Sequence, residues 1–293
     1  MAFVRWLLTV AAVLVGYAGI AAAADIDQSA PPIVGKAAGA APDWVVIIGG
    51  ELRADPAWPG APTTLYQPGG YPLFSIRKPG DPPFFFGARD GFGVPLIVRG
   101  PLEFGPVGTI NWPRYSSQYA QLRGLGNVDW AAELGAYAQY WPTSWLRIRG
   151  ELRQGVGAET GQTGDLFVDA IVPAGQFRFS GGPRLTVQSA AALSPYFSIT
   201  PAQAAASGAS GFAPLTPYNV SGGFYSYGGG SQLEYFFNRQ WQVHAIFEYE
   251  RITGSAADSP LVTMRGSPNQ YTVGAGATYT FNMRPLFDVH PLF

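Results

Sequence analysis

The chain contains two histidines, His244 and His290, and they limit the hydrolytic and metal chemistry available to it. Glu248 and Glu250 share the same alternate positions as His244 along one stretch of sequence. A metal site or a general base needs several converging ligands or partners, and one imidazole beside two carboxylates does not supply them. We therefore expect His244 to be a polar residue of an enclosed interior, and we predict no catalytic site, metal site or cofactor.

Three other features could suggest chemistry, and each has a simpler explanation. Asp169 with Glu151 or Glu133 could form an acid–base pair, but these carboxylates alternate with arginines and are better explained as ion-pair partners. The glycine runs at 222–223 and 228–230 lack the lysine and the helix of a phosphate-binding loop, so strand bending or close packing explains them. The absence of cysteine excludes disulfides, thiolate metal sites and a cysteine nucleophile.

Arginines are the most informative chemical feature. Between residues 145 and 153, three arginines and a glutamate alternate with aliphatic residues and a glycine, so a strand there has one charged and one apolar face. In a barrel the charged face would line the lumen and plug it with ion pairs, whereas a ring of unpaired arginines would favour anion passage. We favour the plug, because a barrel of ten to twelve strands has a narrow interior. The charged residues that we expect to face the lumen are Glu51, Arg53, Asp129, Glu133, Arg147, Arg149, Glu151, Arg153, Asp169, Arg178, Arg184, Glu234, His244, Glu248 and Glu250.

The elements that would position these residues show period-two alternation, which is clearest at 271–281. Odd positions there are apolar and aromatic at both ends, whereas even positions are threonine and glycine. A strand of this length can cross a bilayer, and its terminal aromatic residues are typical of membrane girdles. We predict strands at 44–53, 92–98, 103–111, 128–140, 145–153, 165–172, 176–187, 220–237, 241–250 and 271–281.

The predicted connections alternate in length. Short ones lie at 99–101, 141–143, 173–175 and 238–240, and long ones at roughly 54–84, 112–126, 154–164, 188–219 and 252–268. This alternation predicts a transmembrane antiparallel up-and-down β-barrel with long external loops and short periplasmic turns. The count is ten strands, or twelve if 71–78 and 84–86 form a further hairpin. The alanine-rich start of the 201–218 loop predicts a short helix outside the barrel.

The N-terminus has the features of a secretory signal peptide over residues 1–24: Arg5, an apolar run at 6–20, and the alanines at 22–24 before Asp25. We expect residues 25–42 to be a disordered periplasmic segment, 43–281 the barrel, and 282–293 a C-terminal tail. Only 13% of residues are charged and the net charge is -1, which gives no attraction to nucleic acid and is typical of a surface that meets lipid. We therefore predict export to the outer membrane.

Several short stretches follow one another in a characteristic order. They lie at 56–60, 122–129 leading into 133–135, 161–166, 182–185, 196–208 and 257–262, and the last strand closes with 279–281. In this order and spacing, the chain resembles the MltA-interacting protein (MipA)/OmpV family of outer-membrane proteins over residues 43–281. One minor departure is Ser198, where the family has glycine.

The resemblance implies an outer-membrane barrel whose functions vary within the family. The name-giving member is a scaffold that links a lytic murein transglycosylase to a bifunctional murein synthase, and other members are described as adhesins, antigens or porin-like proteins. This chain departs from the usual ending, because 282–293 follow the terminal aromatic Phe281 and contain Pro285 and Pro291, which cannot continue a strand ladder. Either this tail folds back or Phe281 is recognised internally.

Three functions follow as hypotheses. The first is a non-enzymatic scaffold for peptidoglycan-remodelling enzymes, with outer-membrane lipid, a murein transglycosylase and a murein synthase as partners. The alternatives are a narrow porin or channel and a surface adhesin. The short periplasmic turns offer little surface to a murein enzyme, so residues 25–42 and 282–293 are the sizeable periplasmic segments that could bind one.

Overall fold

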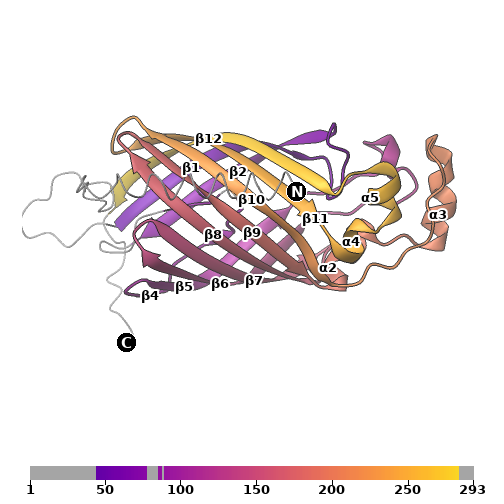
Figure 1. Cartoon of the computed structure of the whole chain (residues 1–293), viewed down its shortest axis with the longest axis horizontal. Helices are drawn as coiled ribbons and strands as arrows, with labels where there is room; N and C mark the ends of the chain where they lie inside the picture. The colour runs from indigo at the N-terminus through magenta and orange to yellow at the C-terminus, as the bar shows by residue number, and fades with distance from the viewer. Residues whose placement is uncertain (1–43, 78–84, 88, 284–293) are drawn as a thin grey trace, which may run out of the picture. The chain divides into compact units, whose positions relative to one another are not determined.

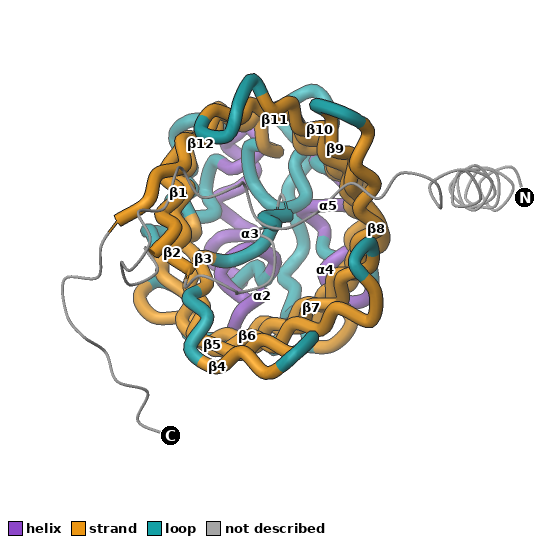
Figure 2. Tube along the Cα trace, turned by 90° about the vertical axis from the view of Figure 1, so that its left-hand side faces the viewer, coloured by secondary structure: helices purple, strands orange, loops and turns teal. Residues whose placement is uncertain are grey.

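The computed structural model describes residues 44–77, 85–87 and 89–283, and these form an all-β antiparallel barrel (Figures 1 and 2). The view along the barrel shows the strands as a ring around the interior (Figure 2). The strands are β1 (Trp44–Pro56), β2 (Tyr66–Arg77), β3 (Phe92–Gly93), β4 (Ile97–Arg99), β5 (Leu102–Asn111), β6 (Ala131–Thr143), β7 (Leu146–Gly157), β8 (Gln162–Ala174), β9 (Phe177–Gln188), β10 (Gly223–Phe236), β11 (Trp241–Ile252) and β12 (Asn269–Met283).

Neighbouring strands pair antiparallel in the order β2-β1-β12-β11-β10-β9-β8-β7-β6-β5-β3, and β4 also pairs with β5. The first and last strands of the chain are thus joined, with Trp44 opposite Met283 and Ala54 opposite Val273. This pairing confirms the predicted transmembrane up-and-down barrel. No helix in the described ranges is long and apolar enough to cross a membrane.

The twelve strands occupy eleven positions around the barrel, because β3 and β4 are two pieces of one strand. Both pair with β5, and the Val94 and Leu96 amides between them still donate to the carbonyls of Pro106 and Phe104 at 3.1 and 3.0 Å. The interruption falls at Pro95, which has no N–H to donate. Ten antiparallel steps separate β2 from β3, so these two edge strands run in the same direction.

The hairpin considered at 71–78 and 84–86 is therefore only half correct. Residues 71–77 lie in β2, but Phe85 and Phe86 belong to no strand, and Phe84 and Lys78 lie outside the described residues. Residues 85–87 and 89–91 instead lie inside the barrel. Phe85 is buried with its ring centroid 4.5 Å from the Arg147 guanidinium carbon, and the Gly91 amide donates to Glu151 at 3.1 Å. Burying an aromatic ring and pairing charged groups inside the lumen explains why this segment does not form the second strand of a hairpin.

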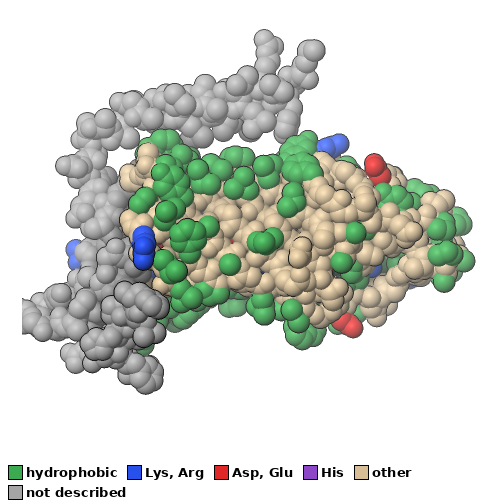
Figure 3. All heavy atoms as spheres, turned by 90° about the horizontal axis from the view of Figure 1, so that it is seen from below, with side chains coloured by type: hydrophobic (Ala, Val, Ile, Leu, Met, Phe, Trp, Pro, Cys, Tyr) green, Lys and Arg blue, Asp and Glu red, His purple; other side chains and the backbone are tan. Residues whose placement is uncertain are grey.

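The outer wall is apolar, as membrane lipid requires. Leu52 is 74% exposed whereas Glu51 beside it is 3% exposed, because alternate side chains point to opposite faces. The space-filling view shows hydrophobic side chains along the wall, with the visible charged side chains towards the ends of the barrel (Figure 3). Aromatic rings gather near the short turns, where Phe177, Tyr235 and Phe237 are in contact, as are Trp241, Tyr279 and Phe281.

The short and long connections lie at opposite ends of the barrel, which we name the turn end and the loop end. The turn-end hairpins contain Gly100 and Gly175 at φ 57° and 63°, a left-handed conformation that glycine adopts without strain. One predicted long loop is short: β7 ends at Gly157 and β8 begins at Gln162, so the connection at 154–164 shrinks to residues 158–161. The residues at both ends of the predicted loop extend the pairing of β7 with β8, for example Gln154 with Gln162. The alternation of residue types along the sequence did not predict this extension.

The long loops fold over the loop end as a small cap (Figure 1). Its helical segments are η2 (Ala120–Leu122), α2 (Ala190–Phe197), α3 (Pro201–Ser207), η3 (Gly208–Ser210), α4 (Gly254–Ala257) and α5 (Pro260–Arg265), so the helix expected early in 201–218 is present. Thr200 begins α3 with a capping box in which it accepts from the Gln203 amide. Two buried apolar clusters hold the cap together, one around Leu122 and Leu261 and the other around Phe197 and Ile252.

The predicted ends of the barrel are close to the observed strand limits. β1 begins at Trp44, and β12 continues two residues past the expected terminal aromatic Phe281, to Met283. The signal peptide at 1–24, the segment at 25–42 and residues 284–293 of the tail lie outside the described residues.

Candidate functional site

Most of the charged residues expected in the lumen are withdrawn from solvent. Arg53, Arg178 and Glu250 are half-buried. Those that are buried are Glu51, Glu133, Arg147, Arg149, Glu151, Arg153, Asp169, Arg184, Glu234, His244 and Glu248.

Asp129 differs from this set, because its side chain is exposed. The strand expected from residue 128 begins only at Ala131, and Val128 instead forms an isolated bridge with Arg114 in the loop before it. Asp129 therefore lies in a loop at the barrel rim, where a carboxylate keeps its hydration.

Arg147 is the centre of the largest group of buried charges and is 0% exposed. It donates to Asp169 from Nε and Nη2 at 3.0 and 2.7 Å, and to Asp90 from Nη2 at 2.8 Å. Asp169 also pairs with Arg184, and Gln139 accepts from Arg147 at 3.3 Å. A buried guanidinium is tolerated when its donors are all used in this way. We name the region around Arg147, with Asp90, Asp169 and Arg184, the packed half of the lumen.

A second group is centred on Arg153, which lies six residues after Arg147 in β7 and closer to the loop end. Arg153 donates to Glu133 at 2.7 Å and to Asp165 at 2.6 Å, and it also pairs with Glu151. Arg149 donates to the same Glu151 at 2.7 Å, so the strand arginines share carboxylates rather than standing alone. None of the arginines at 147, 149, 153, 178 and 184, nor Arg53, lacks a carboxylate partner.

His244 is engaged with one carboxylate rather than with a converging set. Its Nε2 lies 2.7 Å from Glu51 Oε2, and Glu51 also pairs with Arg53. Within the described ranges, no three His, Cys, Asp or Glu side chains are placed to hold a metal ion. His290 lies outside those ranges.

Sequence reasoning missed several members of the network. Arg89 pairs with Glu250 at 3.2 Å and with Glu248 at 3.8 Å, and Asp90 pairs with Arg147. Both come from a Pro-, Phe- and Gly-rich stretch without periodicity, so no sequence signal placed them inside the barrel. Asp165 was detectable, because it has the same parity as Asp169 in β8.

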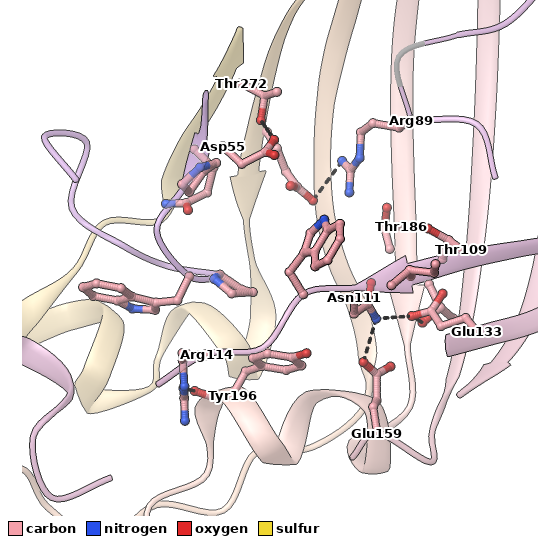
Figure 4. Close-up of a pocket in the computed structure, with 18 of the residues that line it drawn as sticks. Asp55, Arg89, Thr109, Asn111, Arg114, Glu133, Glu159, Thr186, Tyr196 and Thr272 are labelled. Carbon is pink, nitrogen blue, oxygen red and sulfur yellow. Dashed lines mark hydrogen bonds and ion pairs between the residues drawn. The ribbon is translucent and has the colours of Figure 1, made fainter. Parts of the chain in front are cut away.

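A cavity of about 320 Å³ lies in the loop-end half of the lumen, beneath the cap, and we name it the chamber. It is bounded by the loop-end portions of the strands, the 112–114 segment and helix α2 (Figure 4). Asn111 donates from Nδ2 to both Glu133 and Glu159 at 3.0 Å on one side, and Thr272 donates to Asp55 at 3.1 Å on another. The charged residues of the lining are Arg53, Asp55, Arg89, Arg114, Glu133, Arg153, Glu159, Asp165, Glu248 and Glu250.

Two of the charged residues of the chamber, Glu159 and Arg114, lie in the loops at the loop end of the barrel. Burial, followed by the charge of Glu133, raises the pKa of Glu159 to about 7. Burial lowers the pKa of Arg114 to about 10, because its guanidinium donates only to the carbonyls of Tyr196 and Pro195, at 3.1 and 3.2 Å. The chamber thus holds a carboxyl group that changes charge near neutral pH.

Comparison with known proteins identifies the family. Among solved structures, the chain is similar to an outer membrane channel from Pseudomonas putida F1 (10% identity, 88% of this chain and 99% of that chain, TM-score 0.40) and to the NanC porin (7% identity, 80% and 98%, TM-score 0.39). These low TM-scores carry no argument about this chain, and the barrel is established by its own strand pairing. No curated protein sequence matches the chain. The family model described as MltA-interacting protein MipA matches residues 48–281, nearly the whole barrel, and the chain therefore belongs to the MipA family.

Proposed function

We propose that this outer-membrane barrel protein is a non-enzymatic, non-conducting anchor for peptidoglycan-remodelling enzymes, exported through its N-terminal signal peptide. The packed half of the lumen is the observation that supports a barrel that does not conduct ions. Arg147 and Asp169 are both 0% exposed there, and Phe85 and Asp90 contact Arg147 in the same region. Ion permeation would require breaking these buried pairs, at a cost that grows with their burial.

The anchoring part is supported by the family, whose description names an interaction with MltA. The turn-end hairpins are tight and offer little surface: β6 and β7 are joined by residues 144–145 and β8 and β9 by residues 175–176. We therefore assign partner binding to the segment at 25–42 and to the part of the tail after β12, residues 284–293, which flank the barrel in sequence. A murein transglycosylase is the expected partner, and a murein synthase is a further one.

Two measurements on the full mature chain test this proposal. Reconstituted into planar bilayers, the protein should give no conductance steps, and steps of a porin would contradict the non-conducting part. Purified in detergent, it should capture a purified murein transglycosylase, and deletion of 25–42 or of 284–293 should abolish capture while the barrel, which ends at Met283, still folds. Undiminished capture by both deletion variants would refute the assignment of the binding segments.

A surface adhesin is the second candidate, and the cap is the observation that favours it. The cap is folded rather than open loop, and it presents Phe212 and Met264 at 40% and 49% exposure. Replacing both with serine should reduce attachment of cells to host surfaces without changing the yield of folded barrel. Unchanged attachment would remove this candidate.

A further inference from the structure

Two buried carboxylates of the chamber have an oxygen without a hydrogen-bond partner. Glu159 is 1% exposed and Glu248 is 6% exposed, and both line the cavity. In each, Oε1 has no hydrogen-bond partner among the described residues. A buried carboxylate oxygen that accepts no hydrogen bond is costly, so such an atom beside a cavity indicates a place for a donor.

The arginines that line the chamber use their donors elsewhere. Outside the lining, Nε of Arg184 forms an ion pair with Glu248 Oε1 at 4.0 Å, which is too long for a hydrogen bond. Arg153 uses its nitrogens for Glu133, Glu151 and Asp165, and Arg53 pairs with Glu51. Arg114 donates to backbone carbonyls, and Arg89 is shared between Glu248 at 3.8 Å and Glu250 at 3.2 Å. Six carboxylates therefore face four arginines in the lining, and two of these arginines also neutralise carboxylates outside it.

Asp55 adds to this negative excess. It accepts from the hydroxyls of Tyr71 at 2.7 Å and Thr272 at 3.1 Å, and no ion pair of Asp55 is formed within the described residues. The ring of Trp112 also lines the chamber, together with Tyr71, whose ring already carries the Arg53 guanidinium at 4.2 Å from its centroid. Carboxylates together with aromatic rings recognise organic cations through charged hydrogen bonds and cation–π contacts.

We propose that the chamber binds a small organic cation carrying primary amines, whose ammonium groups donate to Glu159 and Glu248. An ammonium group has three donors and no acceptor, which complements unpartnered carboxylate oxygens. A bound metal ion is the weaker alternative, because no three suitable ligands converge in the described part of the chain. The cavity of about 320 Å³ is at the small end of the range for ligand sites, so a compact solute fits it.

The test uses the folded full-length mature barrel in detergent micelles and isothermal titration calorimetry at pH 8, above the pKa of Glu159. The probe is 1,4-diaminobutane, with 1,4-butanediol and succinate as a neutral and an anionic ligand of the same chain length. We expect the diamine to bind with a Kd of about 1 mM or tighter, and the other two at least about tenfold more weakly. Equal binding of the diol, preferential binding of succinate, or no diamine binding would each overturn the proposal.

Variants locate the site. Glu159→Gln and Glu248→Gln, singly and together, should weaken diamine binding by about tenfold or more, since each removes a charge that the ammonium contacts. Asp129→Asn is the matched control, because it removes an exposed carboxylate at the same end of the barrel. Folding is checked by heat-modifiable gel mobility, and if Glu248→Gln does not fold, Glu159→Gln and the three-ligand comparison decide the outcome. Diamine binding that survives in folded Glu159→Gln at full strength would contradict the assignment.

This inference is independent of the anchoring function. Diamine binding without conductance would leave both proposals standing. Conductance steps would refute the non-conducting barrel, and the calorimetric result would still decide the amine site.

Discussion

The packed half of the lumen and the chamber contain the same kinds of side chain, arginines and carboxylates from alternating strand positions, yet they are organised differently. Around Arg147 each guanidinium group pairs with a carboxylate, and Phe85 packs against Arg147. The exception in hydrogen bonding is Nε of Arg184, which lies 4.0 Å from Glu248 Oε1 at the border with the chamber. In the chamber, one oxygen of Glu159 and one oxygen of Glu248 accept no hydrogen bond. The comparison shows that the presence of charged side chains facing the lumen does not distinguish a structural plug from a binding site. The distinction lies in whether those side chains have hydrogen-bond partners within the protein.

The difference follows from which residues enter the lumen between the strands. Asp90 completes the pairing of Arg147 in the packed half. Arg89, the residue before it, reaches the chamber and divides its charge between two carboxylates at 3.2 and 3.8 Å. One short segment therefore neutralises one half of the lumen fully and the other only in part.

The largest expected effect is the loss of a buried ion pair in the packed half. Arg147→Met removes a 0% exposed cation and leaves Asp90 and Asp169 buried without it. We expect the free energy of unfolding to fall by about 3–5 kcal/mol, since an uncompensated buried charge costs that much. Urea unfolding in lipid vesicles, followed by tryptophan fluorescence, measures the change.

The matched control for this variant is Arg239→Met, which removes an exposed arginine in a turn. Its effect should stay within about 0.5 kcal/mol. If the two arginine variants unfold alike, the packed half is not held by buried pairing and the comparison with the chamber fails.

The second-largest expected effect is a dependence of the free energy of unfolding on pH, which originates in the chamber. The folded-state pKa of Glu159, about 7, lies above its ordinary value of 4.5, so between these pH values the folded protein binds more protons than the unfolded chain. The contribution of this group to stability is therefore fully present below about pH 4.5 and is lost as pH rises through about 7. The groups that act on Glu159 are Glu133, Arg153 and Asn111, and Tyr196 and Tyr225 also interact with it.

Glu159→Gln isolates this effect, because glutamine keeps the shape but does not titrate. Unfolding midpoints measured in urea at pH 5 and pH 8 should differ less in the variant than in the unaltered protein. An identical pH response in both proteins would mean that Glu159 is ionised throughout, and the chamber would then lack a neutral-pH switch.

The smallest effect is expected at the barrel rim. Asp129→Asn changes an exposed loop carboxylate and should alter the free energy of unfolding by no more than about 0.5 kcal/mol, since exposed surface charges contribute little. The same urea titration measures it. A loss above about 1 kcal/mol would show that Asp129 joins the buried network after all, and would extend that network beyond the strands.

Much of the barrel could be predicted from alternation alone. In β7, Arg147, Arg149 and Arg153 share one face by spacing, and the structure pairs all three with carboxylates. β2 was harder to recognise, because glycine and proline at 68–70 and Pro72 obscure its alternation. The division of one strand into β3 and β4 was also missed, since its cause is a proline within a strand that remains registered on β5.

The sequence by itself determined the apolar and charged faces of each strand, the alternation of turns and loops, and the family, because these depend on residue type and local spacing. Only the tertiary structure decided the eleven strand positions, the placement of residues 85–87 and 89–91 in the lumen, and the chamber beneath the cap. These features depend on contacts between segments far apart in the chain, such as Asp90 with Arg147 and Asn111 with Glu159. Such contacts are selected by the burial and charge of the completed barrel, which no single stretch of sequence contains.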